Sequence, residues 1–250
     1  MTNNPIWYND ILGDTIKITH RRGFLGLKKE TLTYNNGNLY KKNGDKYTGK
    51  VKGFLKSVVN DLNELQDGAT GKELVNSIVN SKHILRIEKT SGDSKQHGRR
   101  IEFNPNNTSS GLDTSGSVNT KTFVILGHEM AHFYDKYLDN NNNQINPLGT
   151  WFKFGNKIVH NSEKFAVNVE NLIRHEHNLP LRTHYALTIT NKGSYFGTGK
   201  YNLMKIGKIS KQYVKSLINY INFKDYMNIK PEISINQPRI LNNKELYTNQ

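Results

Sequence analysis

The chain of 250 residues contains no cysteine, and this absence restricts the chemistry that it can support. Disulfide bonds and thiolate zinc ligands are both excluded, so a metal ion would need histidine or carboxylate ligands. Such ligands suit a catalytic site better than a structural zinc site. No apolar stretch reaches the roughly 18 residues of a membrane-spanning helix. The first ten residues lack the basic start and the apolar run of a classical signal peptide.

Acidic residues are scarce, with 21 Asp and Glu against 35 Lys and Arg, which gives a formal net charge of +14. A nucleic-acid-binding protein would use such a charge to neutralise phosphates. A lysine-rich surface encoded by an AT-rich genome is the plainer interpretation, and the abundance of Asn, Lys, Ile and Tyr favours it. No basic run is interleaved with aromatic residues as a base-stacking surface would require. We therefore do not expect nucleic acid as a partner.

The sequence HEMAH at residues 128–132 matches the zinc-binding pattern His-Glu-x-x-His. On a helix, His128 and His132 are four residues apart and lie on one face, so both imidazoles can reach one metal ion. Glu129 lies one step round the same helix, where it can act as general base on a metal-activated water. The preceding residues 124–127, Val-Ile-Leu-Gly, carry no charge, which indicates a buried helix. We expect one Zn²⁺ per chain.

Hydrophobic patterning predicts an α+β fold with a small mixed or antiparallel sheet. Alternation and the Asn-Gly pairs at 36–37 and 43–44 predict strands and hairpin turns in the first fifty residues. The predicted strands span 15–19, 31–34, 38–40, 84–87 and 100–103, and a polar loop covers 104–120. The predicted helices span 53–66, 71–80, 162–177 and 210–222, with the histidine helix running from an N-cap at Asn119 or Thr120 to about Leu138.

These elements predict a single domain over residues 1–228. Residues 1–50 would form its β-rich part and residues 51–228 its core, followed by an extended tail at 229–250. No internal repeat or linker divides the chain.

A third protein ligand is needed to complete a catalytic zinc site. The residue six positions beyond His132 is Leu138, so the three-histidine arrangement is excluded. Glu163 and Glu170 are seven residues apart on a later predicted helix and share one face, so one can bind the metal while the other supports the site. We favour Glu163, because it opens that helix and small apolar residues follow it. Glu170 is the alternative.

Other polar residues near the pattern have lesser expected roles. Asp135 and Asp139 follow His132 on its own helix and suit the orientation of a histidine rather than direct ligation. His160 is a rival metal ligand. The remaining histidines of this region are expected at the surface or as supporting residues: His175, His177 and His184.

Residues 162–185, SEKFAVNVENLIRHEHNLPLRTHY, follow the HEMAH segment by about thirty residues. This block resembles the NleD-type effector zinc metalloproteases at Glu163, at Glu170-Asn171, at Arg174 and at the Leu-Pro-x-Arg stretch ending in Arg182. The likeness is most specific between residues 120 and 185. It implies a zincin-like metalloprotease fold of the glutamate type, in which Glu163 is the third zinc ligand.

The same family consists of bacterial proteases that secretion systems deliver into other cells, and related domains end large polymorphic toxins. The resemblance therefore implies a secreted effector or toxin domain. Its expected partners are a protein substrate of the target cell and an immunity protein. We expect no membrane partner.

Arg182 and Tyr185 are candidates for stabilising the oxyanion that forms during peptide hydrolysis. An Arg three residues before a Tyr is similar to the arrangement in clostridial neurotoxin proteases, whose layout this chain resembles. The resemblance assigns both residues a catalytic role beside Glu129.

The sequence thus predicts a zinc-dependent endopeptidase whose extended substrate lies along an edge strand, for which residues 100–104 are the candidate. The alternative is a basic nucleic-acid- or protein-binding module in which the metal helix is only structural. A nuclease-type toxin domain ranks last, because the chain shows neither paired carboxylates nor a His-Asn-His arrangement.

Overall fold

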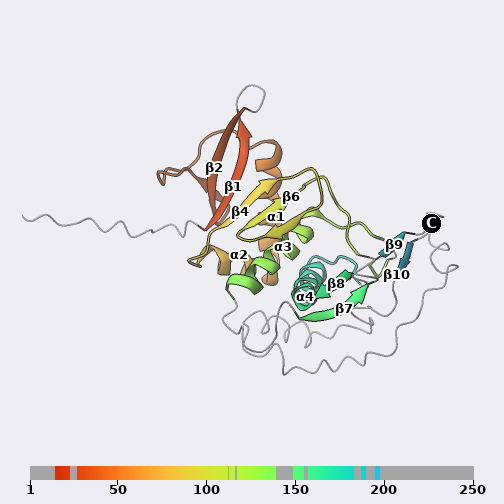
Figure 1. The fold of residues 1–250 in the computed structure, drawn as a ribbon. Helices are drawn as coiled ribbons and strands as arrows, with labels where there is room; N and C mark the ends of the chain where they lie inside the picture. Colours follow the sequence, from red (N-terminus) through yellow and green to blue (C-terminus); the bar gives the residue numbers. More distant parts are fainter. Residues whose placement is uncertain are drawn as a thin grey trace, which may run out of the picture.

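The alternating segments near the start of the chain form the centre of a mixed β-sheet, with helices packed on one face (Figure 1). The computed structural model describes residues 15–22, 27–111, 113–115, 117–138, 149–154, 157–182, 187–189 and 195–197. Within these residues the fold is α+β, as the sequence predicts. The predicted helix at 210–222 and the tail at 229–250 lie outside the described residues.

The main sheet has six strands in the order β3-β2-β1-β4-β6-β5. Strand β1 pairs in parallel with β4 and β4 in parallel with β6, whereas the other pairs are antiparallel. Between β2 and β3, Asn36 and Gly37 both have positive φ, which matches the hairpin turn that an Asn-Gly pair favours. The strands are β1 Ile16–Arg22, β2 Lys28–Asn35, β3 Asn38–Tyr40, β4 Leu85–Lys89, β5 Lys95–His97 and β6 Arg100–Phe103.

The prediction that residues 100–104 form the edge strand is wrong. Strand β6 lies between β4 and β5, so its backbone pairs with a neighbour on both sides. The edge strand on this side of the sheet is β5, which the hydrophobic pattern did not reveal, because none of its three residues (Lys95, Gln96 and His97) is apolar. A tight turn at Gly98, with a φ of 58°, joins β5 to β6.

Four helices cover the sheet's apolar face or pack on one another: α1 Gly53–Asp67, α2 Ala69–Val79, α3 Thr122–Tyr137 and α4 Asn161–Glu176. Helix α1 contacts β1, and α3 contacts β5 and β6. Helices α2 and α4 pack against α3 and against each other. The resulting core joins sheet residues such as Ile18 and Ile101 to helix residues such as Leu62 and Leu126, all of which are fully buried.

The histidine helix α3 starts later than predicted. Its N-cap is Lys121, which makes no side-chain capping bond, rather than Asn119 or Thr120. Thr122, the first helical residue, instead donates its hydroxyl hydrogen to Asp61 on α1 over 2.9 Å. This contact fixes the start of α3 against α1, so the tertiary contact decides where the helix begins.

Two small hairpins that the sequence did not predict complete the described fold. They consist of β7 Thr150–Phe154 with β8 Lys157–His160, and of β9 Leu187–Ile189 with β10 Tyr195–Gly197. Strand β8 leads directly into α4. In the described part of the chain, no helix has both the length and the apolar character to cross a bilayer.

Candidate metal centre

Helices α3 and α4 pack closely together, and the HEMAH segment lies in their contact region. Gly127, one residue before the first histidine, makes this approach possible. A methyl group at Gly127 would lie 2.6 Å from Ile173 Cδ1 on α4 and 3.0 Å from Leu65 Cδ2 on α1. Because no side chain separates the helices at this point, the side chains of α4 can reach the histidines of α3.

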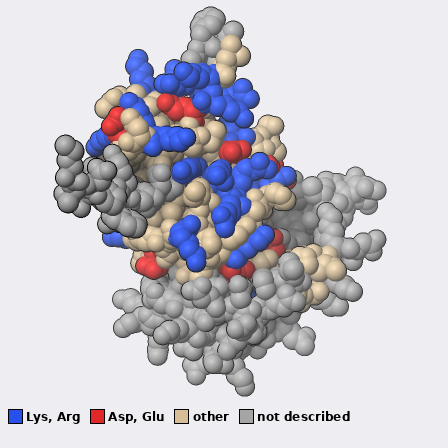
Figure 2. Space-filling view, turned by 60° about the vertical axis from the view of Figure 1, so that its left-hand side comes forward, with Lys and Arg blue, Asp and Glu red and all other residues tan. Residues whose placement is uncertain are grey.

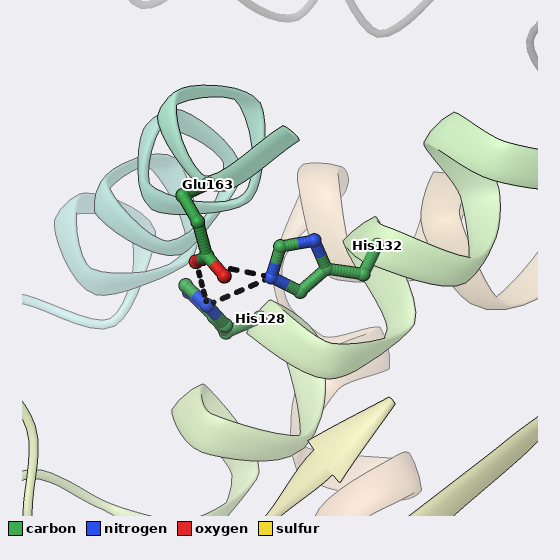
Figure 3. Close-up of side chains that lie close together, drawn as sticks. All are labelled: His128, His132 and Glu163. Carbon is green, nitrogen blue, oxygen red and sulfur yellow. Dashed lines mark hydrogen bonds and ion pairs between the residues drawn. The ribbon is translucent and has the colours of Figure 1, made fainter. Parts of the chain in front are cut away.

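Three metal-binding atoms converge where α3 faces the first turn of α4 (Figure 3). His132 Nε2 lies 3.2 Å from His128 Nε2 and 3.2 Å from Glu163 Oε2. His128 Nε2 lies 3.4 Å from the same Glu163 oxygen. The structure therefore brings together the three residues that the sequence predicts as ligands.

The separations in this triangle fit a tetrahedral ion. Zinc binds imidazole nitrogen and carboxylate oxygen at about 2.0–2.2 Å, and neighbouring ligands of a tetrahedron with such bonds lie about 3.3–3.5 Å apart. The observed separations of 3.2–3.4 Å lie near this range. Two neutral imidazole nitrogens and one carboxylate oxygen are also donors that zinc accepts. These three residues could therefore hold a metal ion.

Glu170 supports this triangle from two turns further along α4. The residue is 2 % exposed, and its Oε2 lies 3.0 Å from His128 Nδ1. A carboxylate can only accept, so this contact places a proton on Nδ1 and leaves the Nε2 lone pair of His128 free to bind a metal. Glu170 thus lies where it can support a metal held by this triangle, and the assignment of Glu163 rather than Glu170 as the third ligand stays a prediction.

The buried charge of Glu170 is matched by two guanidinium groups. Arg174 Nε donates to Glu170 Oε1 over 2.9 Å, and Arg182 Nη1 donates to Glu170 Oε2 over 2.7 Å. Ser110 lies 3.2 Å from Oε1 through its hydroxyl and also accepts from Arg174 Nη2 over 3.1 Å. A buried carboxylate needs such compensation, because its desolvation costs several kcal/mol.

The pKa shifts at this centre show that it favours positive charge on His128. Burial lowers the pKa of His128, but the carboxylates of Glu163 and Glu170 outweigh it and raise that pKa to about 10. Burial raises the pKa of Glu163, but His128 and His132 hold it well below its usual range. Burial also raises the pKa of Glu170, but Arg182, His128 and Arg174 lower it more. Both carboxylates are therefore ionised, and that of Glu163 faces the two histidines with which it could hold a cation.

Glu129 points from α3 toward the edge strand of the sheet. The backbone N–H of Gln96 on β5 donates to Glu129 Oε2 over 2.5 Å. Burial raises the pKa of this carboxyl group, and His128, His132 and the Gln96 N–H partly oppose that effect. The contact joins the proposed base to β5, an edge strand of the main sheet.

Arg182 lies in a different position from the one expected of an oxyanion donor. Its guanidinium contacts Glu170, and its backbone is fixed by Asn171, which accepts from Arg182 N over 2.7 Å and donates to Arg182 O over 3.0 Å. A direct contact of Arg182 with a reacting oxygen stays a prediction. Tyr185 and its expected role lie outside the described residues.

The lesser candidates do not join the triangle. His160 is the N-cap residue of α4, His175 is exposed and the ring of His177 packs on Phe123. Asp135 is half-buried on α3, but Glu170 orients His128 in its place. Asp139 and His184 lie outside the described residues.

Three residues around the site were not assigned a role from the sequence. Ser110 lies in a polar loop without periodicity, and Gln96 acts through its backbone, so no sequence pattern marks either residue as part of the site. Arg174 could have been found, because it is four residues after Glu170 on a predicted helix and the pair has the spacing of a helical ion pair.

Comparison with known proteins agrees with this geometry. No curated protein and no solved structure matches the chain. A family model described as Peptidase_M91, effector protein, matches residues 41–185, which include β4 to β6, all four helices and the converging side chains of α3 and α4. This match covers more than half of the 250 residues, so the chain belongs to the Peptidase_M91 family of effector proteins.

Proposed function

We propose that this protein is a zinc-dependent endopeptidase with a zincin-like site. The single observation that carries this proposal is the convergence of His128 Nε2, His132 Nε2 and Glu163 Oε2 within 3.2–3.4 Å of one another, one residue from Glu129. Membership of a peptidase family supports it.

The ligand set favours catalysis over a structural role. Structural zinc sites are closed by four protein ligands, whereas catalytic sites keep a position for water or substrate. Among the described residues, three such ligand atoms come together. His128, His132 and Glu163 would hold the ion, and Glu170 is the residue that orients His128 rather than a ligand.

A zinc ion held here would acidify a water molecule and polarise the scissile carbonyl group. Glu129 would accept the proton of that water through its carboxylate as the water attacks the carbonyl carbon. The same carboxyl group would then pass the proton to the leaving amine. The buried surroundings of Glu129 suit this exchange, because the N–H of Gln96 holds one carboxylate oxygen in place.

The biological setting follows from the family. An effector peptidase acts on proteins, and we propose that this one is delivered by a secretion system into a target cell and cleaves a protein there. A producing cell that contains the same substrate would need an immunity protein against such an activity.

The test uses wild-type protein and Glu129→Gln, with Glu163→Gln for comparison. Wild type should bind one zinc per chain by elemental mass spectrometry. It should also generate new N-termini in an amine-blocked peptide library made from a cell lysate. Glu129→Gln should keep its zinc and lose activity by about 10²–10⁴-fold, the range of general acid–base catalysis. Glu163→Gln should lose zinc and activity together.

Three results would contradict the proposal. Wild type without stoichiometric zinc, and with a fold that chelation leaves unchanged, would favour a binding module. Zinc-loaded wild type without cleavage above Glu129→Gln would remove the peptidase activity. Cleavage by Glu129→Gln within about tenfold of wild type would remove Glu129 from the mechanism.

A further inference from the structure

The hairpin of β1 and β2 ends in two pairs of like charges. Arg21 lies opposite Lys29, and Arg22 lies opposite Lys28, so the last two cross-strand pairs before the connecting segment are both basic. All four side chains are exposed. Like charges directly opposite each other on adjacent strands destabilise a sheet. The like-charged pairs therefore lower the stability of the hairpin, and an anionic surface bound to them would reduce this repulsion.

Little negative charge lies nearby to offset these four cations. Glu30 is 3.3 Å from Arg22 Nε and is also 3.4 Å from His20, so one carboxylate serves two groups. Within the described part of the chain, Arg21, Lys28 and Lys29 form no ion pair. The positive charge is thus concentrated at one end of the hairpin.

An exposed apolar side chain accompanies the basic pairs. Leu27, directly before β2, is 78 % exposed and is the most exposed of the large hydrophobic residues in the described part of the chain. A single exposed leucine is ordinary on a protein surface. Here it is flanked by basic pairs on two strands.

The hairpin also projects from the molecule. In Figure 1, β1 and β2 extend past the helices at the end of the molecule that is remote from α4, β7 and β8. Figure 2 shows Lys and Arg side chains gathered on this part of the surface, with few acidic residues between them. A flat surface could therefore touch this end while α4, which carries Glu163, lies at the other.

We propose that the charged end of this hairpin, which consists of Arg21, Arg22, Leu27, Lys28 and Lys29, docks the protein on an anionic lipid surface. Leu27 would enter the interface between headgroups and acyl chains. Arg21, Arg22, Lys28 and Lys29 would contact the lipid phosphates. This proposal goes beyond the peptidase activity and does not depend on it. It departs from the expectation of no membrane partner.

The combination of charges and an exposed leucine distinguishes a lipid surface from nucleic acid. Nucleic acid would use the basic residues, but aliphatic leucine offers no stacking surface for a base. An anionic membrane uses both features, because basic residues contact its surface potential while an apolar side chain leaves water. Each Lys or Arg near such a surface strengthens binding by about fivefold.

The first experiment measures sedimentation of the full chain with phosphatidylcholine vesicles, with and without roughly one third phosphatidylserine. Wild type should bind only the anionic vesicles, and added salt should weaken the binding. Lys28→Gln/Lys29→Gln should bind about 25-fold more weakly. The matched control is Lys72→Gln/Lys82→Gln, which removes the same charge from exposed lysines on α2 and before β4 and should change binding by less than about twofold.

The second experiment uses the absence of native cysteine, which makes an introduced cysteine unique. Leu27→Cys, labelled with a polarity-sensitive fluorophore, should shift its emission to the blue on anionic vesicles and should be quenched by brominated lipid. Ile158→Cys is the control, because Ile158 is also an exposed apolar residue, 50 % exposed, but lies on β8 at the other end of the molecule. Its label should not respond.

Three outcomes would overturn the membrane proposal. One is sedimentation that does not depend on phosphatidylserine or on Lys28 and Lys29. Another is vesicle binding in which the label at position 27 stays in water or behaves like the label at position 158. The third is binding of the full chain, through the hairpin, to DNA or to an acidic protein without any binding to vesicles.

Discussion

Asp61 is a buried carboxyl group whose ionisation should lower the stability of the fold. It lies on α1, is 8 % exposed and accepts one hydrogen bond, from Thr122 at the start of α3. Its second oxygen, Oδ2, has no hydrogen-bond partner. Burial raises the pKa of Asp61 from 3.8 to about 6, the bond from Thr122 lowers it, and the charge of Glu64 raises it.

The sign of the effect follows from proton binding. Between about pH 4 and pH 6, the folded chain holds a proton on Asp61 that the unfolded chain has released, so the free energy of unfolding falls as pH rises through this window. Above this window, the free energy of unfolding is lower by the full amount that the pKa shift produces. A rise from 3.8 to about 6 corresponds to about 3 kcal/mol, at 1.36 kcal/mol per pKa unit.

Asp61→Asn should remove this pH dependence, because an amide does not ionise. The amide oxygen can still accept the hydrogen bond from Thr122. The NH₂ group would occupy the place of Oδ2 without a hydrogen-bond partner, and this lowers the free energy of unfolding. That reduction is the same at every pH, so it cancels when the variant is compared with wild type at two pH values. The stability of the variant relative to wild type should rise by about 2 kcal/mol between about pH 4.5 and about pH 8.

Urea unfolding of both proteins at the two pH values, with chelator present throughout, measures this difference. Chelation removes any contribution from metal binding, which itself depends on pH. A change of less than about 0.5 kcal/mol between the two pH values would refute the reasoning, because it would mean that Asp61 ionises as readily in the folded chain as in the unfolded one.

Two further variants test the packing and the support of the site. Gly127→Ala should destabilise the fold by about 1–2 kcal/mol in urea unfolding. The added methyl group would overlap Ile173 and Leu65, and the cost of this overlap should exceed the stability gained from the higher helix propensity of alanine. Gly92→Ala, where the methyl group would meet Thr90 Oγ1 only at 3.8 Å, is its control. Glu170→Gln should weaken zinc binding by about 10–100-fold in a chelator competition, with near-ultraviolet circular dichroism as the check on folding. Unchanged zinc affinity in folded Glu170→Gln would contradict a role in orienting His128.

The helices were predictable because each has a continuous apolar stripe at helical spacing. The observed helices α1, α2 and α4 differ from the predicted ranges by no more than two residues at either end. Strand β3 was also predicted correctly, because the Asn-Gly turn fixes where it starts. Sequence periodicity is thus sufficient where an element buries one face against the core.

In the main sheet, the strands that the sequence missed or predicted too short lack this apolar signal where the prediction failed. Strand β5 is held by its ladder to β6 and by the bond from Gln96 to Glu129, neither of which requires an apolar side chain. Strands β1 and β2 run on past their predicted ends into Arg21, Arg22, Lys28 and Lys29, which alternation alone does not mark as strand. The edge of the sheet and the charged end of its hairpin both depend on backbone pairing that only the structure reveals.

The converging residues of the metal centre were predictable for a different reason. His128, His132 and Glu163 belong to two helices whose spacing is visible in the sequence, so one good contact between the helices brings them together. Their supporting residues are not confined to helices. Ser110 comes from a loop and Arg182 from the segment after α4, and both are fixed by hydrogen bonds between distant parts of the chain.

Glu170 contacts both the helical residues of the metal centre and the supporting residues outside the helices. One carboxylate contacts His128 on α3, Arg174 on its own helix, Arg182 after α4 and Ser110 in the loop before α3. Its negative charge is what makes burial of the two guanidinium groups tolerable, and its position is what fixes the tautomer of His128. Arg182 can therefore influence the centre through Glu170 without touching a substrate. A loss of activity on changing Arg182 would then appear together with weaker metal binding, whereas an oxyanion donor would affect turnover alone.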